Sequence, residues 1–119
     1  MASKTRRSPR DTFDAKGLMA IRLAFAHKFG RLPRGSDPVF FDPHRDRPYS
    51  LPSDAKQRLL LEAMLEAGTA PEIVYALCRT GFAVSGDARR ILPPEQVSRW
   101  DMAIDEYLAF EAKTNTMHH

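Results

Sequence analysis

The sequence predicts an all-α fold: a small four-helix domain with a long, pinned, proline-rich connector and a flexible basic N-terminal arm. Four segments place apolar residues at the three- and four-residue spacing of amphipathic helices. Three of these segments are directly followed by glycine, which readily ends a helix in the left-handed conformation. Alternation typical of a strand is limited to residues 82–92, and no internal repeat indicates a solenoid.

The first predicted helix runs from about Asp14 to Phe29 and ends at Gly30. Its apolar side chains fall at i, i+3, i+7 and i+11 and form one stripe: Leu18, Ile21, Phe25 and Phe29. Arg22 projects within the same apolar arc, so this helix carries a cation beside the face that we expect to be buried.

Residues 31–52 are predicted to form a long connector, because prolines at positions 33, 38, 43, 48 and 52 prevent a continuous helix. Loops of this length are uncommon in compact domains unless they are functional or disordered. Apolar side chains argue against disorder here and are expected to pin the connector: Val39, Phe40, Phe41, Tyr49 and Leu51. Successive side chains of an extended segment point in opposite directions. We therefore expect one of Phe40 and Phe41 to face the core and the other to lie on the surface.

The second predicted helix begins with Ser53 as its N-cap and ends before Gly68. Apolar residues cover most of its circumference: Leu59, Leu60, Leu61, Ala63, Met64 and Leu65. A helix that is apolar almost all round is typically buried. We therefore expect the other helices to pack around this one.

The third predicted helix begins at a capping box formed by Thr69 and Glu72, continues to about Thr80 and ends at Gly81. Together with the second helix it also fits a helix-turn-helix unit that reads DNA. Its exposed positions would carry a single cation, Arg79, although phosphate contacts supply much of the affinity of a DNA reader. We therefore favour the alternative, an αα-hairpin packed for stability.

Residues 82–92 form either a small hairpin or an irregular loop around Ser85, and the fourth predicted helix runs from the turn at Pro93 and Pro94 to about Lys113. Its apolar stripe consists of Val97, Trp100, Ile104, Tyr107 and Leu108. The stripe predicts that Trp100 is shielded from solvent. Three acidic side chains are expected to face away from it: Asp101, Asp105 and Glu106.

The composition divides the chain into a flexible basic arm at 1–12, a single helical domain at 13–113 and a frayed tail at 114–119. The chain has 119 residues, of which 43% are hydrophobic and 28% charged, values typical of a soluble globular domain. No apolar run is long enough to cross a membrane, and no apolar segment follows the basic N-terminus as in a secretory signal. We therefore expect a cytoplasmic protein without membrane contact.

The charge distribution suggests an anionic partner for the first half of the chain. Residues 1–50 carry eleven Lys and Arg against five Asp and Glu, whereas residues 51–119 carry seven against ten. The halves could instead attract each other, within one chain or between copies. We predict a non-enzymatic binding module that contacts nucleic acid or a nucleoprotein through six cations: Lys4, Arg6, Arg7, Arg10, Arg31 and Arg34.

An alternative hypothesis is a protein-interaction module, an adaptor or an inhibitor, that uses the connector 31–52 and the acidic last helix. A protein partner or a second copy of the chain is then expected on exposed aromatic side chains. The candidate partner-binding residues are Phe40, Phe41, Tyr49 and Phe110.

Catalytic, cofactor-binding and metal-binding residues are not predicted. The sequence lacks the glycine-rich phosphate loop, the nucleophile elbow and the zinc-protease motif. The single cysteine, Cys78, excludes an internal disulfide and fits a small buried hydrophobic residue. Asp42, His44 and Asp46 are metal-ligand types, but the arginines beside them would repel a cation, so we expect the aspartates to cap turns.

Overall fold

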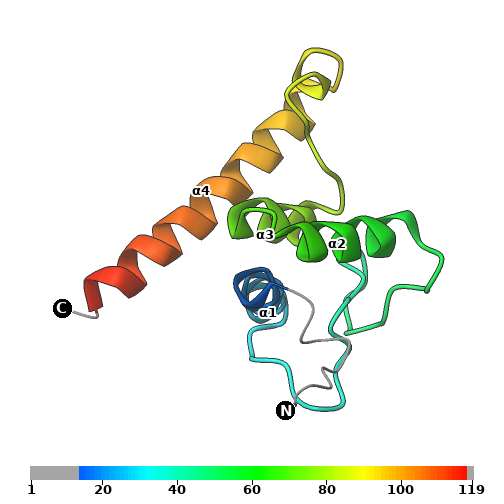
Figure 1. Cartoon of the computed structure of the whole chain (residues 1–119), viewed down its shortest axis with the longest axis vertical. Helices are drawn as coiled ribbons and strands as arrows, with labels where there is room; N and C mark the ends of the chain where they lie inside the picture. The colour runs from blue at the N-terminus through cyan, green and yellow to red at the C-terminus, as the bar shows by residue number, and fades with distance from the viewer. Residues whose placement is uncertain (1–13, 118–119) are drawn as a thin grey trace, which may run out of the picture.

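The computed structural model describes residues 14–117, with side chains through residue 113, and confirms the all-α prediction. More than half of the described residues are helical (Figure 1). The elements are, in order, α1 (Ala15–Phe29), α2 (Lys56–Ala67), α3 (Pro71–Thr80), the 3-10 turn η2 (Ala88–Arg90) and α4 (Pro94–Met117). No helix within the described range is long and apolar enough to cross a membrane.

The predicted glycine stops are confirmed at the ends of α1, α2 and α3. Gly30, Gly68 and Gly81 have φ angles of 73°, 70° and 84°, in the left-handed region that glycine adopts without steric cost. Each backbone N–H then bonds a carbonyl in the last turn of its helix. The start of α1 is also as predicted, because the carboxylate of Asp14 accepts the N–H of Gly17 at 3.0 Å.

The predicted N-caps of α2 and α3 are wrong. Ser53 lies inside a turn closed by the N–H of Ala55 and the carbonyl of Pro52, so α2 begins at Lys56, three residues later. Thr69 is part of the end of α2, because its N–H bonds the carbonyl of Met64. Ala70 therefore precedes α3 without a side-chain cap.

The central helix is α3, not α2 as the sequence predicted. α3 packs most extensively on α1 and α4, and none of its ten residues is exposed. It therefore presents no free face to a DNA groove, which argues against the helix-turn-helix hypothesis. α2 lies at the side of this assembly (Figure 1), with Leu59 and Leu60 54% and 40% exposed. Periodicity reports how apolar a helix face is, but not which element covers it.

The connector is held between α1 and α2, and this explains why both Phe40 and Phe41 are buried. The ring of Phe41 contacts Phe25 and Phe29 of α1, with centroids 5.5 and 5.7 Å apart. The ring of Phe40 lies on the other side, 4.9 Å from the guanidinium carbon of Arg58 in α2. The prediction that one of the two rings lies on the surface is wrong, because protein covers both sides of the extended segment.

A short antiparallel pairing joins the middle of the connector to its C-terminal end. Phe41 and Ser50 form an isolated β-bridge, supported by bonds from Asp42 N–H to the Tyr49 carbonyl and from Leu51 N–H to the Phe40 carbonyl. These bonds pair backbone groups of the connector with one another. The connector is thus an ordered part of the packed structure.

Residues 82–92 form an irregular loop that contains η2, rather than a hairpin. α4 follows it, and its ends extend past α3 (Figure 1). Trp100 is only 3% exposed, which confirms the prediction for its indole. Leu108, predicted on the same buried stripe, is 41% exposed, and α4 continues beyond the expected end at Lys113 to Met117.

Candidate anion-binding groove

A groove of about 320 Å³ lies between α1 and the first part of the connector. α1 contributes four side chains at i, i+3, i+4 and i+7, which therefore lie on one face of the helix: Leu18, Ile21, Arg22 and Phe25. The opposite wall is formed by Pro33, Arg34, Gly35, Asp37, Pro38 and Val39. The groove thus has a mainly apolar floor with charged groups at its sides.

An ion pair shapes the connector wall of this groove. The guanidinium of Arg31 donates to both carboxylate oxygens of Asp37, at 2.7 and 3.2 Å, and lies 5.4 Å from the ring centre of Phe25. Asp37 also accepts the backbone N–H of Arg34 at 2.7 Å, which closes a turn over residues 34–37. These hydrogen bonds, from Arg31 first and then from Arg34, lower the pKa of Asp37 to about 2.

The groove has an excess of positive charge, because Arg31 already neutralises Asp37. The side chains of Arg22 and Arg34 are exposed, and neither forms an ion pair with the side chains described, residues 14–113, although the charge of Arg34 also helps to lower the pKa of Asp37. A guanidinium binds phosphate or carboxylate in a bidentate manner. Two of them beside an apolar floor can hold a ligand that combines an anionic group with a flat apolar one.

The structure brings together only part of the predicted nucleic-acid site. Arg34 lines the groove. Arg31 does not line it but forms the ion pair with Asp37, which does. The four cations of the arm lie outside the described residues: Lys4, Arg6, Arg7 and Arg10. Arg22 was not predicted as a site residue, although its place within the apolar arc of α1 was a sequence signal for it.

The four aromatic residues predicted to bind a partner differ in burial: two are buried and two are exposed. Phe40 and Phe41 are 7% and 2% exposed, so a partner cannot reach their rings directly. Tyr49 and Phe110 are about half exposed and lie on the connector and on α4. The ring of Tyr49 is 5.0 Å from the guanidinium carbon of Arg45, a cation–π contact at the surface.

A second polar cluster joins α1, α3 and α4 around Glu106. One oxygen of its carboxylate accepts the hydroxyl of Tyr75 and, at 3.0 Å, the Nε–H of Arg79. The other oxygen lies 3.4 Å from Nε2 of His27. The prediction that Glu106 faces away from the core is therefore wrong, because α3 supplies two donors at its position on α4.

The pKa shifts in this cluster fit a structural role better than acid–base chemistry. Burial first, and then the bond to Glu106, raise the pKa of Tyr75. Burial alone would raise the pKa of Glu106, but the bonds from Tyr75 and Arg79 outweigh it and lower this pKa. A general acid or base works best with a pKa near neutrality, and both groups are shifted away from it.

The remaining reactive side chains also have structural explanations. Burial raises the pKa of the Cys78 thiol to about 12, as expected for an unreactive core residue. Asp42 accepts the backbone N–H of His44 at 2.9 Å and lies 3.7 Å from Arg45, so it caps a turn. Among the described side chains, no three His, Cys, Asp or Glu residues gather in a group that could hold a metal ion.

No protein-family model matches the chain, and comparisons with curated proteins and with solved structures also found no match.

Proposed function

We propose that this protein is a non-enzymatic binding module that contacts nucleic acid through its basic N-terminal half. The observation that carries the proposal is the pair of exposed guanidinium groups, Arg22 and Arg34, which form no ion pair within the described residues and lie at the sides of an apolar-floored groove. Phosphates are the anions that such groups contact along a nucleic acid, and an apolar floor offers van der Waals contact to the sugar or base beside them.

The cations of the arm extend the same argument along the chain. The arm precedes α1 directly and carries Lys4, Arg6, Arg7 and Arg10. Cations gain affinity for a nucleic acid mainly by releasing condensed counterions, which requires charge but no fixed geometry. The groove then adds positioned contacts to binding that is otherwise independent of nucleotide sequence.

The test is fluorescence anisotropy of labelled single-stranded and duplex oligonucleotides with the full-length protein over a series of salt concentrations. Removing one cation that binds a phosphate should flatten the log–log salt dependence by about one. We expect Arg22→Ala with Arg34→Ala to reduce the slope by about two, and deletion of residues 1–12 to reduce it by about 3–4.

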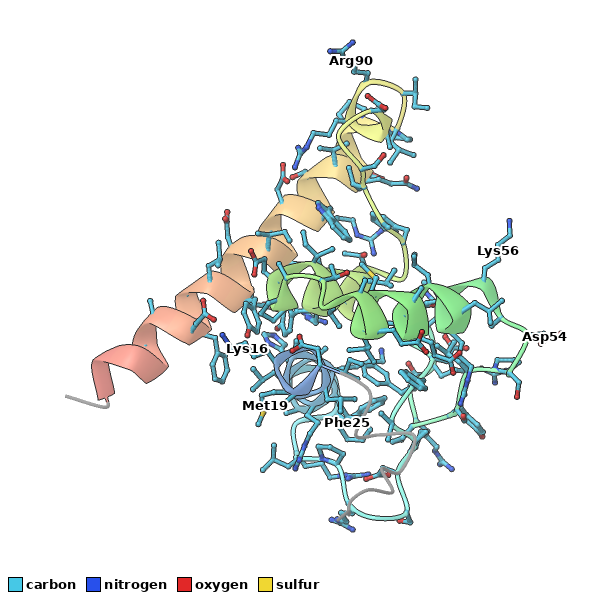
Figure 2. All side chains as sticks on the ribbon, in the orientation of Figure 1. Lys16, Met19, Phe25, Asp54, Lys56 and Arg90 are labelled. Atoms are coloured by element: carbon cyan, nitrogen blue, oxygen red, sulfur yellow. The ribbon has the colours of Figure 1, made fainter. Side chains whose placement is uncertain are left out.

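Arg90→Ala is the matched control. Arg90 is an exposed arginine of η2 without an anionic partner among the described residues, and it lies at the end of the molecule far from α1 (Figure 2). Its removal should leave the slope unchanged. The proposal is overturned if wild-type protein binds neither DNA nor RNA at low salt, or if Arg90→Ala weakens binding as much as the groove variant.

If no oligonucleotide binds, the alternative function is a protein-interaction module, which is tested by capture of a protein partner. In that case the partner is captured equally well at high salt, because an apolar contact depends little on ionic strength. Deletion of the arm would then have no effect on binding.

A further inference from the structure

The outer face of α2 is apolar and uncovered, which the fold itself does not explain. Leu59 and Leu60 are 54% and 40% exposed, and Ala63 and Ala67 are also exposed on this helix. The inner face of α2 packs through Leu61 and Leu65, which are at most 1% exposed. The helix is therefore apolar on two faces, of which the described part of the chain buries one.

We propose that this outer face of α2 is a self-association surface, on which a second copy of the chain packs its own α2 in the antiparallel direction. This inference concerns a different surface from the groove and does not depend on nucleic-acid binding. Small side chains in a helix face let a second helix approach closely, and leucine then fills the space above them. Leu59 of one copy would cover Ala63 of the other.

The charges on α2 are complementary to themselves in this arrangement. Lys56 is exposed near the start of α2, and Glu66 is exposed near its end. Neither has an ionic partner among the described residues, and Figure 2 shows Lys56 pointing away from the body of the molecule. If the twofold axis passes at the level of residue 61, positions equally far before and after residue 61 lie opposite each other in the two copies. Residues 59 and 63 form one such pair of positions, and residues 56 and 66 form another. The register that places Leu59 opposite Ala63 therefore also brings Lys56 level with Glu66 of the second copy.

Twofold symmetry makes every contact in such an interface occur twice. The antiparallel direction also sets the two helix dipoles in opposite senses, which is favourable. A helix of 12 residues is only about 18 Å long, so the interface is smaller than that of a permanent dimer. We therefore expect reversible, concentration-dependent association.

Sedimentation equilibrium of the full-length protein, from micromolar to millimolar concentration, tests the proposal. The average mass should rise from 13.5 kDa toward twice that value. Leu59→Gln should weaken association by about tenfold or more, since one substitution removes two symmetry-related leucines from the interface. Ile91→Gln is the matched control, because Ile91 is 83% exposed in the loop before α4 and should not matter.

Charge exchange tests the register itself. Lys56→Glu places two carboxylates opposite each other and should weaken association several-fold at low salt, whereas Lys113→Glu on α4 should not. Adding Glu66→Lys to Lys56→Glu restores the pairing and should restore the wild-type mass. Circular dichroism shows whether each variant is folded. A protein that stays monomeric at millimolar concentration overturns the proposal, as does failure of the double exchange to restore association in a folded protein.

Discussion

Glu106 holds three helices together with a single carboxylate. Tyr75 and Arg79 of α3 donate to it, and His27 of α1 lies beside its second oxygen. Tyr75 is only 1% exposed, and a buried hydroxyl needs a partner to offset its desolvation. The hydroxyl of Tyr75 and the carboxylate of Glu106 therefore fix the position of α4 on α3.

Tyr75→Phe removes the hydroxyl of this bond and leaves the ring in place. We expect the free energy of unfolding to fall by about 1–2 kcal/mol, because a hydrogen bond to a charged group is removed. Urea denaturation measures the change. Tyr49→Phe is the control, since Tyr49 is 51% exposed and the substitution should change stability very little. Equal stability of both variants would show that the bond to Glu106 contributes nothing.

The raised pKa of Tyr75 predicts that the stability of the protein depends on pH in the alkaline range. Burial and the bond to Glu106 raise the pKa of Tyr75 above its ordinary value of 10.0, so it stays neutral in the folded protein when the unfolded chain already ionises. The free energy of unfolding should therefore fall as the pH rises above 10. In Tyr75→Phe this fall should be shallower but not absent, because the pKa of Tyr107 is raised as well. An unchanged slope contradicts the assignment.

Cys78 reports on the core. Its thiol is 3% exposed, and burial raises its pKa to about 12, so almost no thiolate exists at neutral pH. We expect a thiol reagent at pH 8 to label the native protein very slowly and the urea-unfolded protein at once. Fast labelling of the folded protein would show that α3 is not enclosed by α1 and α4.

At the scale of elements, the contact between α1 and α2 depends on one glycine. A β-carbon added at Gly17 would collide with a methyl group of Leu65, which is buried in the core and would have to shift. The N–H of Asp14 also bonds the carbonyl of Leu65 at 3.1 Å, so the start of α1 lies directly against the end of α2. Helix propensity alone would favour alanine at position 17.

Gly17→Ala should therefore destabilise the protein in spite of that propensity. Overpacking a filled contact costs about 1–3 kcal/mol, which exceeds the gain of about 1 kcal/mol from replacing glycine in a helix. Thermal denaturation of Gly17→Ala measures the net effect. Gly86→Ala is the control, because a β-carbon there meets nothing within 4 Å. A Gly17→Ala protein more stable than wild type would disprove the close contact.

Sequence patterns predicted the existence and the C-terminal ends of the helices well, but they predicted poorly which helices pack against each other. Gly30, Gly68 and Gly81 end helices because glycine adopts the left-handed backbone conformation without steric cost. This cause depends only on the residue itself, so the sequence could show it. The position of α3 at the centre depends on contacts between segments far apart in the chain. Periodicity therefore assigned the centre to α2, the helix with the most apolar circumference.

The candidate site follows the same division. Arg34 belongs to the basic half that composition indicated, but its position opposite Arg22 depends on how the connector folds back on α1. Arg31 carries the same charge, yet Asp37, six residues further on, pairs with it. Composition gives the number of cations, whereas only the fold shows which of them form ion pairs with a carboxylate.

At the scale of the whole molecule, the first half of the chain carries the excess of cations, and within the described residues Arg22 and Arg34 bring part of that excess to one groove. α4 projects from the rest of the molecule (Figures 1 and 2). Two of its acidic side chains form ion pairs, Asp101 with Arg89 and Glu106 with Arg79. We expect this excess of positive charge to direct an anionic partner to the first half of the chain. The arm precedes α1 and adds its cations to the same half of the chain.

The most direct test of this account is a titration of isotope-labelled, full-length protein with a short oligonucleotide, followed by amide chemical shifts at low salt. We expect the largest changes in α1 and in residues 31–39, centred on Arg22 and Arg34, and we expect them to diminish as salt is added. Shifts confined to α4, or the absence of shifts at any oligonucleotide concentration, would contradict the assignment of the groove as a nucleic-acid site.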